Sequence, residues 1–151
     1  MIPSVVCIGG SDSAAAAGIQ ADSRVVAALG YHPAIVITAV TAQNTRTLAA
    51  WDGVAPALVA RQWQALHDDL QIAAIKVGML GSVGVAAVVG EVLRASQRLP
   101  IVLDPVLQAS IGGELTGDVL IDGVSLGGLA LHEVAGRVGI VFPNPASQLS
   151  G

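Results

Sequence analysis

Charged residues are scarce in this sequence, and basic residues are the scarcest of them. Charged residues make up 12% of the 151 residues, and lysine and arginine together number 7. The basic residues are scattered singly, and the formal net charge is −4. A protein that binds a nucleic-acid backbone needs a basic stripe that neutralises phosphates. We therefore expect no nucleic-acid partner.

Long uninterrupted apolar runs are also missing, although hydrophobic residues make up 53% of the chain and the mean hydropathy is +0.70. A membrane-spanning helix needs about 20 consecutive apolar residues. The uncharged stretch between Lys76 and Glu91 is interrupted by several glycines. No basic segment precedes the apolar run Val5–Ile8, which favours a first strand over a signal peptide. We expect no membrane segment and a cytoplasmic protein.

Cysteine and histidine are too few for a disulfide framework or an evident metal centre. Cys7 is the single cysteine, so it has no partner for an internal disulfide, and its apolar surroundings favour a buried, inert thiol. His32, His67 and His132 are widely separated and lack the spacing of zinc ligands. We interpret them as surface or hydrogen-bonded histidines.

The sequence does contain a regular alternation of short apolar runs and helical periodicity. The runs that predict strands are Val5–Ile8, Ala34–Val40, Ala73–Val77, Ile101–Leu103 and Val138–Phe142. The stretches that predict helices are Ile19–Leu29, closed by Gly30, then Pro56–Leu70 and Val83–Ser96. Strands that alternate with helices indicate βαβ units and a mostly parallel sheet. We expect an α/β fold that forms a single domain over residues 1–151.

The loops that follow the predicted strands carry polar residues and glycines. They begin at Gly9-Gly10-Ser11-Asp12, Thr41-Ala42-Gln43-Asn44, Gly78-Met79, Asp104-Pro105 and Pro143-Asn144. Ligands of open α/β sheets bind outside the carboxyl ends of the strands. The sequence therefore predicts a functional rim at this edge of the sheet.

Five segments in this order resemble the successive motifs of one enzyme family. They are Gly10-Ser11-Asp12-Ser13, Ala17-Gly18-Ile19-Gln20-Ala21-Asp22, Thr41-Ala42-Gln43-Asn44-Thr45, Lys76-Val77-Gly78-Met79-Leu80 and Val102-Leu103-Asp104-Pro105-Val106. The chain resembles the hydroxymethylpyrimidine/phosphomethylpyrimidine kinases of thiamine biosynthesis, members of the ribokinase-like superfamily, from about Val5 to Asn144. The resemblance implies a three-layer sandwich, ATP with Mg²⁺ as cofactors, and phosphoryl transfer to a pyrimidine alcohol or its monophosphate.

The same resemblance implies a set of pyrimidine-binding residues. It assigns Gly10, Asp22, Gln43, Met79 and Val106 to the substrate. An amide such as Gln43 offers a donor and an acceptor that match a ring nitrogen and an amine of an aminopyrimidine. The Asp22 carboxylate would accept a hydrogen bond from the substrate hydroxyl. Taken alone, however, Gln43 is equally typical of a turn cap, Asp22 of a solvated first helical turn, and Met79 and Val106 of a core.

Lys76 is the only lysine of the chain and falls within a strand predicted to be buried. Such a position needs a partner. We expect an ion pair with Asp12 or Asp104 at a neighbouring strand end, and a contact with a substrate phosphate is the alternative.

The sequence departs from the family pattern in two substrate loops. Ala14-Ala15-Ala16-Ala17 stands where the family has a glycine-rich turn. Alanine disfavours positive φ and close ligand approach, so the loop either forms an early helical turn or narrows the pocket. The loop 107–113 also lacks the basic residue or threonine that often precedes Ser-Gly in the family.

A further departure concerns the nucleotide side. Asn144 is our candidate on that side, but Ser147 stands where the family carries the glutamate of Asn-x-x-Glu. The sequence given ends at Gly151, before the family's glycine-rich anion hole. Phosphoryl transfer depends on metal and electrostatic stabilisation, so we expect no catalytic residue in this chain and pyrimidine binding at best.

The sequence allows two functions other than that of a kinase part. The first is a non-catalytic protein that binds a pyrimidine or only dimerises. An unpaired strand Val138–Phe142 would leave an apolar edge, which predicts a homodimer or a complementing chain.

The second alternative is a serine hydrolase, because Gly123-Val124-Ser125-Leu126-Gly127 matches a nucleophile elbow. No aspartate follows Ser125, and the acid and histidine are in the wrong order, which disfavours hydrolysis.

Overall fold

The computed structural model describes residues 2–104, 120–121 and 124–125, and its centre is a five-stranded sheet. The strand order is β3-β2-β1-β4-β5. The strands are β1 (Ser4–Ser11), β2 (His32–Gln43), β3 (Leu48–Gly53), β4 (Ile72–Val77) and β5 (Ile101–Leu103). All neighbouring strands are parallel except β2 and β3, which are antiparallel. The predicted α/β class with a mostly parallel sheet is confirmed.

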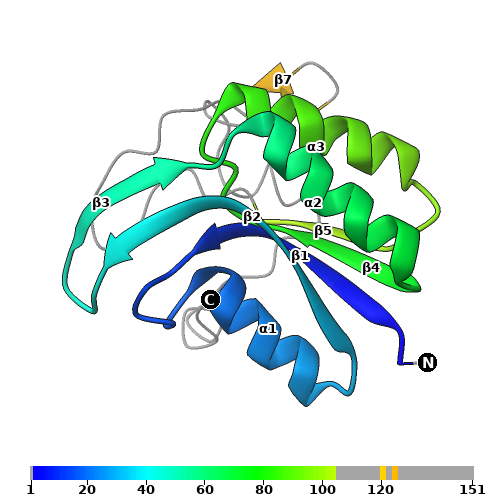
Figure 1. The fold of residues 1–151 in the computed structure, drawn as a ribbon, viewed down its shortest axis with the longest axis horizontal. Coiled ribbons are helices and arrows are strands. Elements are labelled where there is room, and N and C mark those ends of the chain that lie inside the picture. The colour runs from blue at the N-terminus through cyan, green and yellow to red at the C-terminus, as the bar shows by residue number, and fades with distance from the viewer. Residues whose placement is uncertain (1, 105–119, 122–123, 126–151) are drawn as a thin grey trace, which may run out of the picture.

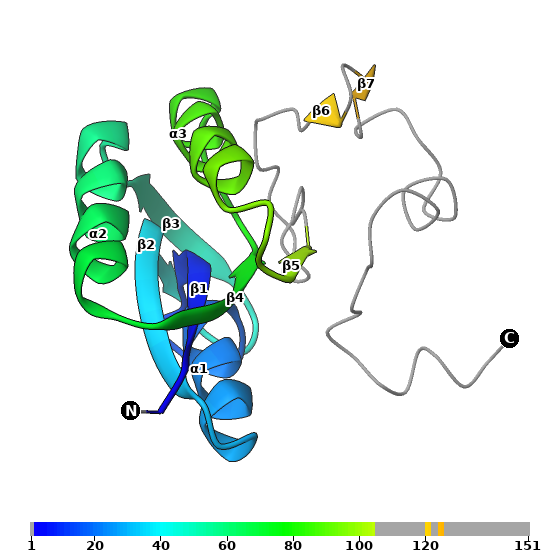
Figure 2. The ribbon, with the colours of Figure 1, turned by 90° about the vertical axis from the view of Figure 1, so that its right-hand side faces the viewer.

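Three helices cover the sheet on its two faces. They are α1 (Gly18–Ala28), α2 (Pro56–Asp69) and α3 (Val83–Ala95). Figures 1 and 2 show α1 on one face and α2 with α3 on the other, so the sheet is the middle of three layers. The predicted helices begin and end within one residue of these bounds. A short antiparallel pair, β6 (Leu120–Ile121) and β7 (Val124–Ser125), forms a separate two-stranded sheet.

The larger part of the buried core lies between the sheet and the pair α2 and α3. Its buried members are Val6, Ile8, Ala34, Val36, Val59, Trp63, Ile75, Val77, Val85, Val89 and Val92. The face under α1 has a smaller cluster of Cys7, Ile19 and Val26. The alternation of side chains along β1 explains the division, because successive residues of a strand point to opposite faces.

Local signals in the sequence set the helix ends. Gly30 follows α1 with φ of +84°, its N–H donates to Ala27, and the N–H of Tyr31 donates to Val26. This is the hydrogen-bond pattern of a Schellman motif, which glycine favours. At the start of α3, the Ser82 hydroxyl accepts from the N–H of Val85 at 3.2 Å.

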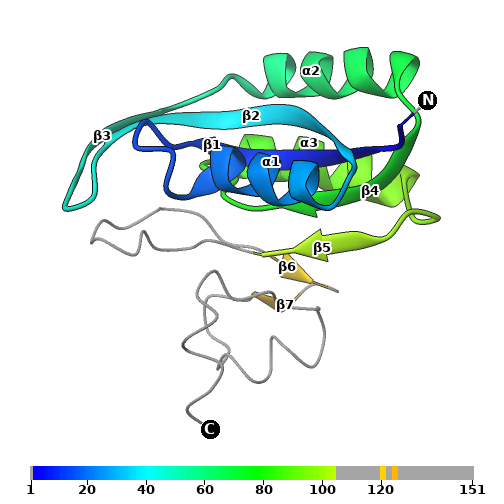
Figure 3. The same cartoon turned by 90° about the horizontal axis from the view of Figure 1, so that it is seen from below.

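The antiparallel strand β3 was not predicted from the sequence. It pairs with the end of β2 from Ala39 with Gly53 to Gln43 with Leu48. Figure 3 shows this pair, which we name the β2–β3 arm (residues 39–53), running on beyond the helices. The apolar run of β3, residues 48–51, is only four residues long and half of it is alanine, which is depleted in strands, so the sequence gives a weak strand signal.

The expected fifth strand and the expected dimer concern residues that the structure does not describe. The predicted strand Val138–Phe142 lies outside the described residues, and so does the edge on which the expected dimer depends. None of the helices in the described part of the chain has the length and apolar character that a bilayer crossing requires.

Candidate functional site

Gly10 and Met79, two of the predicted substrate residues, lie against each other. A Cβ atom built on Gly10 would lie 3.0 Å from Sδ of Met79, so a larger residue at Gly10 would displace the thioether. The hydroxyl of Thr38 donates to the carbonyl oxygen of Met79 at 2.5 Å. The end of β1, the interior of β2 at Thr38 and the loop after β4 therefore meet around Met79.

Gln43 is fixed to the loop after β1 through its backbone. The hydroxyl of Ser13 accepts from the N–H of Gln43 at 2.8 Å and donates to its carbonyl oxygen at 2.6 Å. The side-chain amide of Gln43 contributes a hydrogen bond that lowers the pKa of Asp12. Gln43 is only partly buried, so its amide lies between the Asp12 loop and solvent.

Asp12 is buried, and the backbone of the following loop surrounds its carboxylate. The N–H groups of Ala14, Ala16 and Ala17 donate to it at 2.8, 2.9 and 2.8 Å. Burial raises the pKa of Asp12, but these backbone hydrogen bonds and the one from Gln43 outweigh it, and the pKa lies below its ordinary value. Asp12 is therefore a structural anion of the loop, and the predicted pairing of Asp12 with Lys76 is wrong.

The alanine loop does not form an early helical turn, which corrects one of the two expectations for it. The helix α1 begins at Gly18, and Ala15 adopts a φ of +56°. Gly18 has a φ of +58°, and a Cβ there would lie 2.4 Å from the carbonyl oxygen of Gly10. A positive φ at Ala15 lies outside the right-handed helical region, so the alanine loop does not extend α1. The narrower pocket that the alanines imply stays a prediction.

Lys76 pairs with two carboxylates on the face of the sheet under α1. Its Nζ lies 2.9 Å from Oδ2 of Asp22 and 3.6 Å from Oδ2 of Asp104. The predicted pairing with Asp104 is confirmed, and the closer partner, Asp22, was not foreseen. The three side chains are 20% to 24% exposed, so this cluster (Asp22, Lys76 and Asp104) is shielded but not sealed from water.

Burial and the ion pairs change the protonation chemistry around this cluster. Burial raises the pKa of Asp104 above its ordinary value, although the nearby Lys76 ammonium lowers it. Burial, and then the charge of Asp22, raise the pKa of the Cys7 thiol to about 11, against a lowering by Lys76. Cys7 is therefore held as a neutral thiol, which supports the predicted inert role.

The predicted substrate residues thus fall into neighbouring groups. Gly10 and Met79 are in contact, Gln43 joins the Asp12 loop, and Asp22 lies with Lys76 on the α1 side. Among residues 2–104, no hydrogen bond or ion pair links Asp22 to Gln43 or Met79. Val106 and Asn144 lie outside the described residues, as does most of the hydrolase-like segment around Ser125.

Nothing in the described part of the chain has the make-up of a metal centre. Residues 2–104 contain no group of three or more His, Cys, Asp or Glu side chains placed to hold an ion. Asp22 and Asp104 come close to each other, but the Lys76 ammonium lies between them and neutralises their charge. These residues do not fit Mg²⁺, which prefers oxygen ligands without a competing cation.

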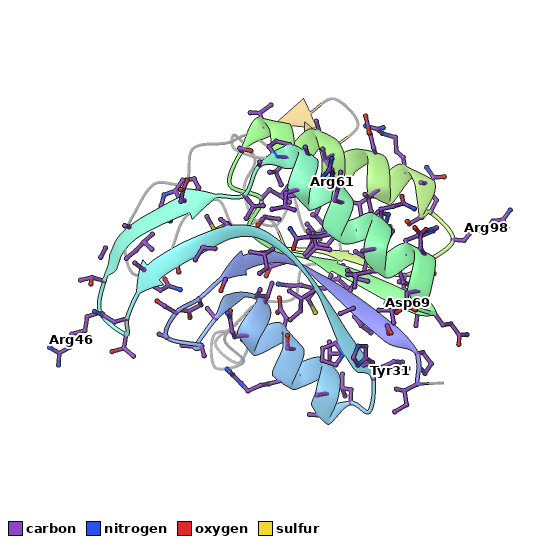
Figure 4. The ribbon with its side chains drawn as sticks, in the orientation of Figure 1. Tyr31, Arg46, Arg61, Asp69 and Arg98 are labelled. Atoms are coloured by element: carbon purple, nitrogen blue, oxygen red, sulfur yellow. The ribbon has the colours of Figure 1, made fainter. Side chains whose placement is uncertain are left out.

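A hollow of about 470 Å³ lies at the opposite end of the sheet. It is lined by the last residues of α2 and α3 and the segments that lead into β4 and β5, among them His67, Arg94 and Arg98. In Figure 4, Arg98 and Asp69 are seen at this end and Arg46 at the tip of the β2–β3 arm. None of the predicted site residues lines this hollow.

The sequence does contain a pattern that indicates the pairing of Asp22 with Lys76. Asp22 follows the buried Ile19 by three residues and precedes the buried Val26 by four. These spacings place it on the inward stripe of α1. A carboxylate on that stripe needs a cation, and the single lysine of the neighbouring strand supplies it.

The fold agrees with the family to which comparison with known proteins points. The sequence model of the family described as phosphomethylpyrimidine kinase matches residues 12–144. The hydroxymethylpyrimidine/phosphomethylpyrimidine kinase of Rhizobium meliloti (strain 1021) is 43% identical over 108 residues, which are 72% of this chain and 40% of that protein. The thiamine biosynthesis bifunctional protein ThiED of Geobacter sulfurreducens is 42% identical over 112 residues, 74% of this chain and 23% of that protein.

Solved structures show the same fold. The crystal structure of phosphomethylpyrimidine kinase from Clostridium difficile 630 is similar with a TM-score of 0.67 and 36% identity, over 76% of this chain and 49% of that one. The pyridoxal kinase of Staphylococcus aureus in complex with ADP has a TM-score of 0.60 and 30% identity, over 69% of this chain and 38% of that one. The chain thus spans less than half the length of these relatives. From its motifs, its fold and its match over residues 12–144, the chain belongs to the phosphomethylpyrimidine kinase family.

Proposed function

We propose that this chain provides the pyrimidine-binding part of a hydroxymethylpyrimidine/phosphomethylpyrimidine kinase of thiamine biosynthesis. The whole reaction is the ATP-dependent transfer of a phosphoryl group to a pyrimidine alcohol or its monophosphate. The observation that carries the proposal is the meeting of Gly10, Met79 and the Gln43 loop at the carboxyl ends of β1 and β2. This is the edge of the sheet where open α/β folds bind ligands.

Each proposed contact uses a group with suitable chemistry. The Met79 thioether is a soft, polarisable surface for a flat ring, and Gly10 leaves room for it. The Gln43 amide would pair with a ring nitrogen and the exocyclic amine. Asp22 would accept from the substrate hydroxyl through the oxygen that Lys76 does not hold, and Val106 would add a second apolar wall.

The nucleotide side of the proposal depends on the family. Solved pyridoxal kinases of Staphylococcus aureus hold ADP, or AMP-PCP with pyridoxal, and resemble this fold. We propose ATP and Mg²⁺ as cofactors of the whole kinase, with Asn144 on that side. ATP supplies the transferred phosphoryl group. The residues that the structure describes would bind and orient the pyrimidine.

Assembly and location complete the proposal. A homodimer or a complementing chain stays a prediction, because it rests on the apolar strand expected at residues 138–142. We also place the protein in the cytoplasm, in keeping with a single buried, unpaired cysteine. A strictly monomeric mass at high micromolar concentration would count against the dimer.

Calorimetric titration of the purified chain with hydroxymethylpyrimidine tests the central part of this proposal. We expect saturable binding to one site per chain. The variant Gln43→Ala should weaken it about tenfold through the loss of two hydrogen bonds. Gln64→Ala is the matched control, because Gln64 is an exposed amide of α2 whose side chain donates to Asp68.

The other outcomes of the titration separate the competing interpretations. Pyrimidine binding without ATP binding favours a binding protein or a kinase part. Absence of both contradicts the proposal and favours a purely structural or dimerising role. Steady phosphorylation of the pyrimidine by this chain alone would show that our expectation of no catalytic residue is wrong.

A further inference from the structure

An aromatic side chain of the β2–β3 arm lies beside the Met79 thioether. A Cβ atom built on Gly81 would lie 3.3 Å from Cζ3 of Trp51, 3.7 Å from Cβ of Ala39 and 4.0 Å from Cε of Met79. The edge of the Trp51 indole and the methyl group of Met79 therefore both lie next to Gly81. Because Gly81 has a φ of +78° and no side chain, it leaves the space that the indole occupies.

The pairing of the arm places Trp51 on the side that faces the end of β1. Trp51 is opposite Thr41 in the antiparallel ladder, and directly opposite residues project to the same face. Thr41 is buried, and its hydroxyl donates to the carbonyl oxygen of Ser11 at 3.0 Å. Trp51 thus lies on the same face of the arm as Thr41, which contacts the end of β1 at Ser11.

Trp51 is the one aromatic residue near the strand ends among those described. Trp63 is 8% exposed and belongs to the core under α2. Tyr31 lies at the amino end of β2, on the far side of the molecule from the arm in Figure 4. Trp51 is only partly buried, so it keeps accessible surface in the part of the chain that the structure describes.

We propose that Trp51 is a specificity-determining residue that closes the pyrimidine pocket from the β2–β3 arm. With Met79, its neighbour over Gly81, it forms one apolar wall built from β3 and the loop after β4, two segments that are far apart in the sequence. An indole and a thioether both favour contact with a flat aromatic ring. The wall therefore selects a planar heteroaromatic alcohol over a saturated one. The inference rests on the proposed pyrimidine site and adds a residue to it.

Tryptophan fluorescence gives a direct readout, because the chain has 2 tryptophans and the other is buried in the core. In the unchanged chain, acrylamide should quench Trp51 and leave Trp63 largely unaffected. Saturating hydroxymethylpyrimidine should protect Trp51 from acrylamide and shift its emission. The variant Trp63→Phe leaves Trp51 as the only emitter and should show the same protection at the same ligand concentration.

Affinity measurements then test whether the contact contributes to selection. Trp51→Ala should weaken pyrimidine binding about tenfold, the effect of losing one good aromatic contact. Trp51→Phe should restore most of the affinity, because it keeps a flat ring. Tyr31→Ala is the matched control and should bind as the unchanged chain does.

The outcomes distinguish this inference from the function on which it rests. If the unchanged chain binds no pyrimidine by calorimetry, the proposed function fails and this inference fails with it. If it binds, but Trp51→Ala retains its fold and its affinity, the proposed function stands and the role of Trp51 is overturned. The role of Trp51 is also overturned if saturating hydroxymethylpyrimidine leaves Trp51 of the unchanged chain open to quenching by acrylamide. This measurement needs no substitution at Trp51.

Discussion

The two faces of the sheet are stabilised in different ways. Under α2 and α3, eleven buried residues form one apolar cluster that contains no charged side chain. Under α1 the buried cluster has three residues, and Lys76, Asp22 and Asp104 take up the neighbouring space. The first face stabilises the fold, and the second leaves room for polar groups next to the strand ends. The difference shows that the α1 side holds partly exposed charged groups where the other face holds only apolar ones.

The largest effect should come from the anion that organises the loop before α1. Asp12→Ala would leave the N–H groups of Ala14, Ala16 and Ala17 without their acceptor. We expect a loss of about 3 kcal/mol in the free energy of unfolding, measured by urea denaturation. If the loss is under about 1 kcal/mol, water replaces the carboxylate and the α1 side does not depend on it.

The pH dependence of stability tests the same residue without a large cavity. The pKa of Asp12 is lower in the folded chain than in the unfolded one. Its contribution is therefore present above the unfolded pKa and is lost as the pH falls through the folded pKa. Asp12→Asn should flatten the acid limb of the stability profile, and an unchanged profile would contradict the role of the carboxylate.

Adjacent valines of β1 compare the two faces directly. Val6 is fully buried under α2 and α3, whereas Val5 is only partly buried on the α1 side. Val6→Ala should cost about 2–3 kcal/mol and Val5→Ala about 1 kcal/mol of unfolding free energy. The two variants remove the same atoms from the same strand. Equal losses in chemical denaturation would contradict the difference between the faces.

Removing the cation of the α1 side should have a moderate effect. Lys76→Met would leave the Asp22 and Asp104 carboxylates beside each other without a counter-charge. We expect a loss of about 1–2 kcal/mol near neutral pH, smaller than for a sealed ion pair because the groups are partly exposed.

The sign of the pH effect identifies the cause of that loss. Without Lys76 the pKa of Asp104, already raised, should rise further. Since its protonated form then removes the repulsion, the difference from the unchanged chain should shrink as the pH falls. Lys76→Arg keeps the charge and serves as the control. A loss of stability that does not change with pH would assign Lys76 a packing role only.

The smallest effect should be a gain in the alanine loop. Ala15 has a positive φ, which is unfavourable for a residue with a Cβ atom. Ala15→Gly should stabilise the chain by about 0.5–1 kcal/mol in thermal or urea unfolding. Ala14→Gly, whose φ is not positive, should destabilise it slightly, because glycine gains more freedom in the unfolded chain.

Much of the fold could be predicted because the parallel strands and the helices carry strong periodic patterns. Four of the five predicted strands correspond to β1, β2, β4 and β5, and the fifth lies outside the described residues. The strand β3 was not predicted, because its apolar run, residues 48–51, is short and half alanine, which does not favour a strand. Its position is imposed by pairing with β2, a tertiary effect that local propensity does not show.

The residues of the candidate site come from the family resemblance, whereas several of their contacts appear only in the structure. The family resemblance named Gly10, Asp22, Gln43 and Met79, and the strand-end rule placed them at one edge. The choice of partner for Lys76 depended on how α1 packs over β1 and β4, which brings Asp22 to 2.9 Å. Likewise, Asp12 accepts from its own loop because Ala14 to Ala17 curl around it, and no spacing in the sequence indicates that curl.

The most direct test of the central claim is the pattern of amide shifts in heteronuclear NMR spectra as hydroxymethylpyrimidine is added to the unchanged chain. We predict the largest changes at the backbone amides of Gly10 and Met79 and at the side-chain amide of Gln43. The residues around the hollow at the opposite end, such as His67 and Arg94, should keep their positions. Changes confined to that hollow, or none at all, would contradict a pyrimidine site at the strand ends.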